Sequence, residues 1–328
     1  MVKARKQSKN GKSPSGDLTL IQVAAKFSTE EAAREYFENL RWPDGPACPH
    51  CGNCDQARLY KVTPNPEKKI RAGLYKCAEC LQSFTVTVGT VCEDSHIPLN
   101  KWLIGFYMMC ASKTQVSALQ LQRQLEIGSY RSALFMCQRI RFALMDVFPT
   151  GKLGGTVEVD ETYIGGKRRV MGRRYTGNKT AVVSMVERDG NVRSYVPRKV
   201  SGDTLGRLLK THVSQDARLN TDEAPLYKKA GKNFASHDSV NHSLEEYGRY
   251  KDGRLVTTNT VEGFFGDTKR SLDGTLHNVG AKYLFLYLAE LDYKYNTRKE
   301  TDGARTALGI PKIVGKRLML RRPSGKKQ

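Results

Sequence analysis

The sequence lacks long apolar segments and is poor in acidic residues. No run of about eighteen apolar residues occurs in its 328 residues, so we expect no membrane-spanning helix. Residues 1–16 hold neither an acidic residue nor the apolar core of a secretory signal. There are only 33 aspartates and glutamates against 54 lysines and arginines, a formal net charge of +21. We therefore expect a cytoplasmic protein that binds a polyanion, the commonest of which is nucleic acid.

Basic charge is concentrated at both ends of the chain. Residues 1–27 are predicted to be a basic disordered arm, because the first sixteen combine five lysines and arginines with Ser and Gly. Residues 301–328 are predicted to be a basic C-terminal tail, since Pro311 to Gln328 again contains no acid. Both ends could add contacts to DNA phosphates. The alternative for the tail is a solvated terminus without a partner.

Four of the eight cysteines form two C-x2-C pairs, Cys48 with Cys51 and Cys77 with Cys80, with 25 residues between the pairs. In a reducing compartment such pairs indicate metal binding rather than disulfides. Two knuckles complete a tetrahedral four-thiolate zinc site of the zinc-ribbon type. Cys54 also forms a C-x2-C pair with Cys51, but using that pair would leave Cys48 without a partner.

The sequence around the cysteines fits a small zinc-binding domain, residues 28–94. Ser28 or Thr29 is predicted to cap a helix that runs through Leu40. Hairpin strands are predicted at the ends of the loop between the knuckles, and a further strand at Phe84–Thr90. Four thiolates leave no open coordination position, so this zinc would be structural and the domain would bind DNA or protein.

Residues 95–150 are predicted to form a helical module. Leu99–Ser112 is an apolar helix, Ser117–Leu125 a short one, and Ser129–Val147 a third that carries Arg131, Arg139 and Arg141. A short helix, a turn containing glycine and a basic helix resemble a DNA-binding helix-turn-helix. The alternative is a plain three-helix packing module.

The segment Thr156–Ile164 is predicted to be a β-strand that ends at a double glycine. Because side chains alternate along a strand, Glu158, Asp160 and Thr162 share one face. A carboxylate in a buried strand is costly unless a metal or a cation neutralises it. The alternative is an edge strand whose acidic face lies in water.

The elements that follow repeat a known order. Strands are predicted at 180–186, 192–197 and 217–222 and a possible fifth at 234–237, with helices at 201–213, 226–232, 258–272 and 281–299. The order βββαβα(β)αα is that of the ribonuclease-H-like fold, in which the first and fourth strands are central neighbours. The expected fold class is therefore a multi-domain α/β protein with a ribonuclease-H-like mixed-sheet core at residues 151–300.

This fold would bring three acids together: Asp160 on the first strand, Asp222 at the end of the fourth, and Glu262 on the late helix. Three converging carboxylates can hold two Mg²⁺ ions. Such a metal pair supports in-line phosphoryl displacement on a polynucleotide. Taken singly, Glu262 could be a solvent-exposed helix acid and Asp222 a turn residue.

Two further residues on the late helix are candidates for the same site. Asn259 lies one turn before Glu262, so either could be the third metal ligand, and we favour Glu262 because a carboxylate neutralises a dication better. Lys269 follows Glu262 by seven residues, which puts both on one helix face, where the lysine could reach a DNA phosphate.

The chain resembles bacterial insertion-sequence DDE transposases that have an N-terminal zinc ribbon and an ISXO2-like, ribonuclease-H-like catalytic domain. The resemblance runs from about Ser28 to Arg298 and includes both cysteine knuckles. The other segments that carry it are 159–167, 221–223, 259–265 with Lys269–Arg270, 274–277 and 295–298.

The resemblance implies an enzyme that binds the ends of a mobile DNA element, cleaves their 3′ ends and transfers the strands to a target. It implies magnesium or manganese in the core, double-stranded DNA at the terminal inverted repeats and target as partner, and association with the bacterial nucleoid. Because two ends must be paired, at least a homodimer is expected in the active complex. The alternatives are a transposase-derived regulator with an inert core and a ribonuclease-H-type nuclease without strand transfer.

Overall fold

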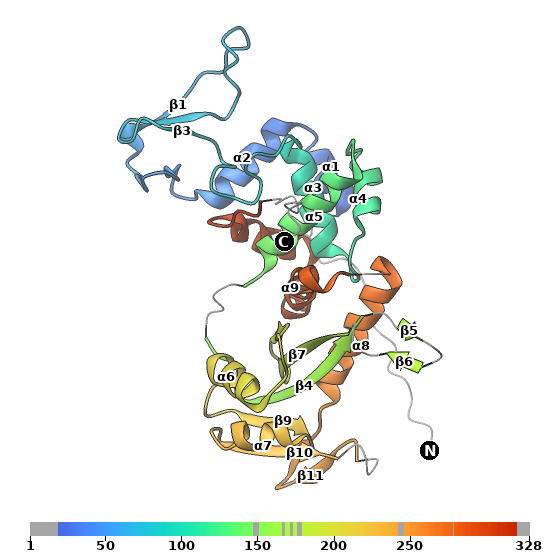
Figure 1. The fold of residues 1–328 in the computed structure, drawn as a ribbon. Coiled ribbons are helices and arrows are strands. Elements are labelled where there is room, and N and C mark those ends of the chain that lie inside the picture. Colours follow the sequence, from blue (N-terminus) through green and yellow to red (C-terminus); the bar gives the residue numbers. More distant parts are fainter. Residues whose placement is uncertain are drawn as a thin grey trace, which may run out of the picture. The chain divides into compact units, whose positions relative to one another are not determined.

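The computed structural model describes residues 19–319, apart from 147–150, 166–167, 171–172, 176–178, 242–245 and 278. These residues divide into two compact units, one of residues up to 111 together with 299 onward, and one of residues 112–298 (Figure 1). The basic segment 1–16 and the last nine residues lie outside the described residues. None of the described helices is both long and apolar enough to cross a membrane.

The helices of the first unit pack around α3, which contacts α1, α2 and α10. Their bounds are α1 Leu20–Lys26, α2 Glu30–Arg41, α3 Leu99–Ala111 and α10 Asp302–Gly309. Helix α2 begins as predicted, because the Thr29 side chain accepts a hydrogen bond from the Ala32 N–H and acids occupy the first turn.

Two helices lie within the segments that were expected to be a basic disordered arm and a basic tail. Helix α1 forms within the expected arm 1–27, where a capping box at Thr19 starts it and Val23 and Phe27 become buried. Helix α10 forms within the expected tail 301–328, and Thr301 caps it. The disordered arm is therefore wrong for residues 20–26, whereas the basic tail 301–328 carried no prediction of secondary structure. In both cases the capping residue and a few apolar residues outweigh the basic composition.

The zinc-ribbon segment holds a three-stranded antiparallel sheet in the order β1-β2-β3. The strands are β1 Leu59–Lys61, β2 Tyr75–Cys77 and β3 Ser83–Phe84. The ring of Trp42 meets Tyr75 and Phe84 edge-on, with centroids 5.6 and 5.8 Å away. The predicted strand Phe84–Thr90 is wrong beyond Phe84, because Val88 and Thr90 donate backbone hydrogen bonds three residues back and Gly89 adopts a φ of 72°.

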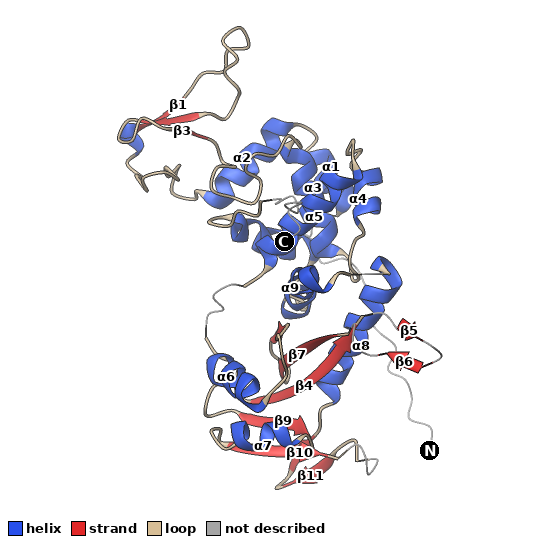
Figure 2. Ribbon diagram, in the orientation of Figure 1, coloured by secondary structure: helices blue, strands red, loops and turns tan. Residues whose placement is uncertain are grey.

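The second unit is a mixed α/β structure built on a five-stranded sheet in the order β10-β9-β4-β7-β8 (Figure 2). Strands β10, β9 and β4 run parallel, and β7 and β8 are antiparallel to their neighbours. The bounds are β4 Thr156–Ile164, β7 Thr180–Glu187, β8 Val192–Tyr195, β9 Arg218–Asp222 and β10 Ser236–Val240. Two hairpins add β5 Arg168–Val170 with β6 Arg173–Tyr175, and β11 Arg249–Lys251 with β12 Arg254–Val256.

Each face of the sheet carries its own apolar core. Val157 and Val159 of β4 pack with α6 and α7, while α8 and α9 cover Val182 and Val186 of β7 on the opposite face. Glu158 and Asp160 alternate with Val157 and Val159 along β4, so the predicted alternation puts them on the α8 face. The helices are α6 Gly202–His212, α7 Pro225–Gly231, α8 Asn259–Ser271 and α9 Leu284–Asn296. Short helical turns span Gln56–Arg58, Leu272–Leu276, Ala281–Tyr283 and Ile310–Ile313.

Two further helices of this unit, α4 Ala118–Gln124 and α5 Tyr130–Leu144, lie within the predicted helices Ser117–Leu125 and Ser129–Val147, and Ser117 and Ser129 cap them. Of the three arginines that suggested a DNA-reading helix, Arg139 and Arg141 are buried and only Arg131 is exposed. The helix-turn-helix assignment and the boundaries 95–150 stay predictions.

Arg141 belongs to a buried ion cluster that joins α5 to α9. Its Nε lies 2.8 Å from Glu290 Oε2, and Lys294 Nζ lies 2.8 Å from Glu290 Oε1. Gln115 Nε2 donates to the same carboxylate at 3.1 Å. Although burial alone would raise the pKa of Glu290, Lys294 and Arg141 hold it below its ordinary value.

We predict that Glu290→Gln destabilises the second unit by about 3–5 kcal/mol, because it leaves two buried cations without their anion. Thermal unfolding at neutral pH measures the effect. The stabilisation is present above the ordinary glutamate pKa of 4.5 and is lost as the pH falls through the lower folded-state pKa, so the difference between the proteins should shrink in acid.

The matched control is Asp267→Asn, which breaks the exposed pair with Arg270 and should shift stability by less than about 0.5 kcal/mol. Equal melting of Glu290→Gln and wild type at neutral pH would contradict the role of the cluster.

Candidate functional site: a cysteine cluster and an acidic group on the sheet

The four predicted cysteines converge. Their Sγ atoms all lie within 4.8 Å of one another, with Cys48 and Cys80 at 3.6 Å and Cys51 and Cys77 at 3.7 Å. Tetrahedral zinc with Zn–S bonds of about 2.3 Å requires sulfur separations of about 3.8 Å. The cluster therefore fits a structural zinc ion.

Backbone hydrogen bonds favour the thiolate of one of the four cysteines, Cys77. Hydrogen bonds from the N–H groups of Cys80 and Glu79 lower the pKa of the Cys77 thiol to about 6, although burial opposes this. Asn53 Nδ2 also donates to Cys77 Sγ, at 3.8 Å. Cys54 is exposed and outside the cluster, which agrees with the predicted ligand set. Cys92, Cys110 and Cys137 are buried.

On the sheet, Asp160 is half-buried on the central strand β4. Burial raises the pKa of Asp160 to about 7, against the opposing hydrogen bond that Glu161 N–H donates to Asp160 Oδ1 at 2.7 Å. The carboxylates of Asp222, Glu161 and Glu262 raise it further. Asp160 thus lies among acids that strengthen its affinity for a positive charge.

Asp222 ends the neighbouring strand β9. The last residues paired between the two strands are Val159 and Thr221, so Asp160 and Asp222 follow directly at the same level of the sheet. Asp222 Oδ1 accepts a hydrogen bond from Ala224 N–H at 3.1 Å, which orients the carboxylate at the start of α7.

Glu262 and Asn259 are both exposed in the first turn of α8, and Lys269 is exposed two turns later. Glu262 Oε1 accepts a hydrogen bond from the Thr258 hydroxyl at 3.0 Å. The carboxylate of Glu262 is among the groups that raise the pKa of Asp160, so α8 places it close enough to act on that charge.

The acids approach each other less closely than the cysteines do. In the part of the chain that the structure describes, only the four cysteines bring three or more ligand atoms within 4.8 Å of one another. Asp160, Asp222 and Glu262 are close enough to influence charge at Asp160 but do not meet that spacing. Four thiolates suit zinc, and the carboxylate group suits a hard dication such as magnesium.

Two acids of β4 have partners that the sequence did not reveal. Glu161 points to the opposite face and accepts a hydrogen bond from the Tyr227 hydroxyl of α7. Burial raises the pKa of Glu161, and Asp222 adds to the rise. Glu158 is completely buried and contacts the start of α8. Its position on the face of Asp160, two residues earlier, was the one sequence signal that it belongs near the site.

Comparisons with known proteins match two segments of this chain. Residues 152–296 match the family model of the ISXO2-like transposase domain, and residues 28–83 match that of the transposase zinc-ribbon domain. A protein of Halobacterium salinarum, described as an uncharacterized protein in transposable element ISH50, is 26% identical over 273 residues. The aligned part covers 75% of this chain and 84% of that protein.

The two domains define a transposase that carries a zinc ribbon ahead of its transposase domain. The chain belongs to the IS1595 family of insertion-sequence transposases.

We predict that Cys77→Ser releases the zinc ion, because a hydroxyl cannot replace a thiolate in this site. Metal analysis of the purified protein should fall from about one zinc per chain to none. The matched control is Cys54→Ser, which changes a cysteine outside the cluster and should keep the metal. Zinc retained in Cys77→Ser, or lost in Cys54→Ser, would contradict the ligand set.

Proposed function

We propose that the protein is a DDE-type DNA transposase that binds the ends of an insertion sequence, cleaves their 3′ phosphodiester bonds and transfers the strands to target DNA. The observation that carries the proposal is that Asp222 and Glu262 act on the charge of Asp160 within the matched transposase domain. The pKa of Asp160 is already raised.

The sheet supports a ribonuclease-H-like fold for this domain. Its first strand β4 is central, pairs antiparallel with the next long strand β7, and pairs parallel with β9, which ends in Asp222. In this proposal Asp160, Asp222 and Glu262 hold the divalent cations, magnesium or manganese. These would activate the attacking oxygen and stabilise the leaving oxygen of an in-line displacement.

The protein's own groups would position the DNA around these acids. Lys269 extends from the α8 face of Glu262 and would hold a phosphate. A hollow of about 480 Å³ in the second unit is lined partly by Lys179, Arg198 and Lys199, and it could take a stretch of DNA backbone. The zinc ribbon and the α4–α5 pair would recognise the element ends. Pairing two ends requires at least a dimer in the active complex.

We predict that Asp160→Asn abolishes metal-dependent cleavage while end binding persists, because the change removes a cation ligand and leaves the ribbon untouched. DNA that flanks the gene, labelled at its 3′ and 5′ ends, is incubated with protein and Mg²⁺ or Mn²⁺. Discrete nicks at an inverted repeat are expected with wild type, and none with the variant.

The matched control is Asp216→Asn, at an exposed turn before β9, which should cleave like wild type. Binding without nicks in either protein would favour the regulator with an inert core, and scattered nicks the nuclease. Unchanged cleavage by Asp160→Asn would refute the site.

We predict that Glu262→Gln abolishes cleavage, whereas Asn259→Ala lowers it without abolishing it. The reason is that Glu262 acts on Asp160 electrostatically and a neutral amide would not balance a dication. The same nicking assay, run over a range of Mn²⁺ concentrations, measures both variants. The reverse order of effects would make Asn259 the third ligand.

A further inference from the structure

The first turn of α8 has no cap of its own. An α-helix begins with backbone N–H groups that have no partner inside the helix, and a side chain at the N-cap usually satisfies one of them. At α8 the N-cap residue Thr258 makes no such hydrogen bond. Its hydroxyl instead donates to Glu262. The helix that carries Glu262 therefore needs capping from elsewhere in the chain.

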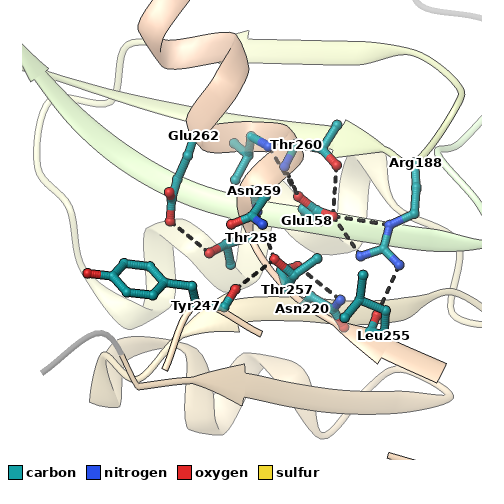
Figure 3. Close-up of polar contacts among 11 residues, drawn as sticks. Glu158, Arg188, Asn220, Tyr247, Leu255, Thr257, Thr258, Asn259, Thr260 and Glu262 are labelled. Atoms are coloured by element: carbon teal, nitrogen blue, oxygen red, sulfur yellow. Dashed lines mark hydrogen bonds and ion pairs between the residues drawn. The ribbon is translucent and has the colours of Figure 1, made fainter. Parts of the chain in front are cut away.

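Glu158 supplies that cap from β4 (Figure 3). Its Oε2 accepts hydrogen bonds from the N–H groups of Thr260 at 2.7 Å and Val261 at 3.1 Å. Its Oε1 accepts one from the Thr260 hydroxyl at 2.9 Å. The remaining early N–H, that of Asn259, donates to the Thr257 hydroxyl at 3.2 Å. A carboxylate suits this position because the helix N-terminus carries partial positive charge.

Arg188 balances the buried charge. Its Nη2 lies 2.7 Å from Glu158 Oε1, and its Nη1 donates to the carbonyl of Leu255, at 3.0 Å. The Glu158 side chain is 0% exposed, so its carboxylate has no direct contact with solvent. Both of its oxygens already accept hydrogen bonds, from Thr260, Val261 and Arg188. It is therefore a poor candidate for a metal ligand despite its position on the face of Asp160.

Strand β9, which pairs with β4, also binds the segment just before α8. Asn220 of β9 pairs in register with Glu158, and its Nδ2 donates to the carbonyl of Thr257 at 3.1 Å. Two residues further along the two strands come Asp160 and Asp222. Side chains repeat their direction every second residue along a strand. Glu158 and Asn220 therefore bind the start of α8, and the next pair on the same face is Asp160 and Asp222.

We propose that Glu158 is a positioning residue, which fixes the first turn of α8 on β4 so that Glu262 meets Asp160 and Asp222 as a divalent cation requires. This inference rests on the proposed function, since it assumes that the three acids bind the metal. Glu158 itself touches neither metal nor DNA.

The test compares Glu158→Gln with wild type in the full-length, zinc-loaded protein. The amide keeps the size of the side chain but turns one acceptor into a donor that faces the helix N–H groups and Arg188. Mn²⁺ binding, measured by calorimetry without DNA, should weaken about 10- to 100-fold, as for other groups that orient metal ligands. The Mg²⁺ concentration needed for half-maximal cleavage should rise similarly, while binding to the element ends is unchanged.

The matched control is Glu187→Gln. Glu187 also accepts backbone N–H groups, from Gly154 and Asn191, and alternation along β7 turns it away from the face on which Val186 packs against α8. It should keep wild-type Mn²⁺ affinity. Where Glu158→Gln fails to fold, Thr260→Val and Thr260→Ser give the answer, since only the valine removes the hydroxyl bond to Glu158. The valine should weaken Mn²⁺ binding and the serine should not.

Asp160→Asn separates this inference from the proposed function. Loss of Mn²⁺ binding in Asp160→Asn with wild-type affinity in folded Glu158→Gln, or equal affinities of the two Thr260 variants, would overturn the positioning role alone. Wild-type affinity in Asp160→Asn would overturn the metal site and the proposed function with it.

Discussion

The free-energy cost of burying a carboxylate determines how charged groups are paired in the second unit. Glu290 and Glu158 are both fully buried, and each is neutralised within the protein, the first by Arg141 and Lys294, the second by Arg188 and the N-terminus of α8. Asp160 is different. Burial and then the carboxylates of Asp222, Glu161 and Glu262 raise its pKa to about 7, against one hydrogen bond from a backbone N–H. A partly buried carboxyl group that has three acids near it and a raised pKa has the electrostatics of a site that would attract an external cation.

The period of the β-strand links capping to chemistry. Glu158 and Asp160 point the same way because they are two residues apart, and the parallel register repeats the arrangement at Asn220 and Asp222. The strands that present the aspartates therefore also hold the helix that presents Glu262. Any shift of α8 along the sheet would have to break the hydrogen bonds at Thr260 and Val261 before it changed the distance between the acids. The hydrogen bonds to Glu158 therefore fix the position of α8 along the sheet, where its other contacts are largely apolar.

Much of this arrangement could be predicted from local pattern. Strand Thr156–Ile164 and the caps Thr29, Ser117 and Ser129 follow from alternation and from side-chain oxygens at helix starts. The four-cysteine cluster follows from spacing. The tertiary capping by Glu158 could not be predicted, because it joins residues about a hundred positions apart and depends on the register of the sheet. Helix α1 was missed because basic composition suggested disorder where only Val23 and Phe27 needed burial. The hairpin β11–β12 gave no strong alternating pattern.

Buried arginines also explain why the basic helix was the weakest sequence argument. An arginine on a helix suggests a DNA-reading surface only if the helix turns it outward, and the spacing of Arg139 and Arg141 does not determine that. In the structure Arg141 stacks its guanidinium 4.0 Å from the ring centre of Tyr287 and pairs with Glu290, and Arg139 packs over Phe135. Arg141 thereby joins α5 to α9, and both arginines are buried, so neither presents its charge on an outer surface of α5. If the α4–α5 pair reads DNA, exposed side chains such as Arg123 and Arg131 must do so, and the large positive charge of the chain must act mainly through other surfaces.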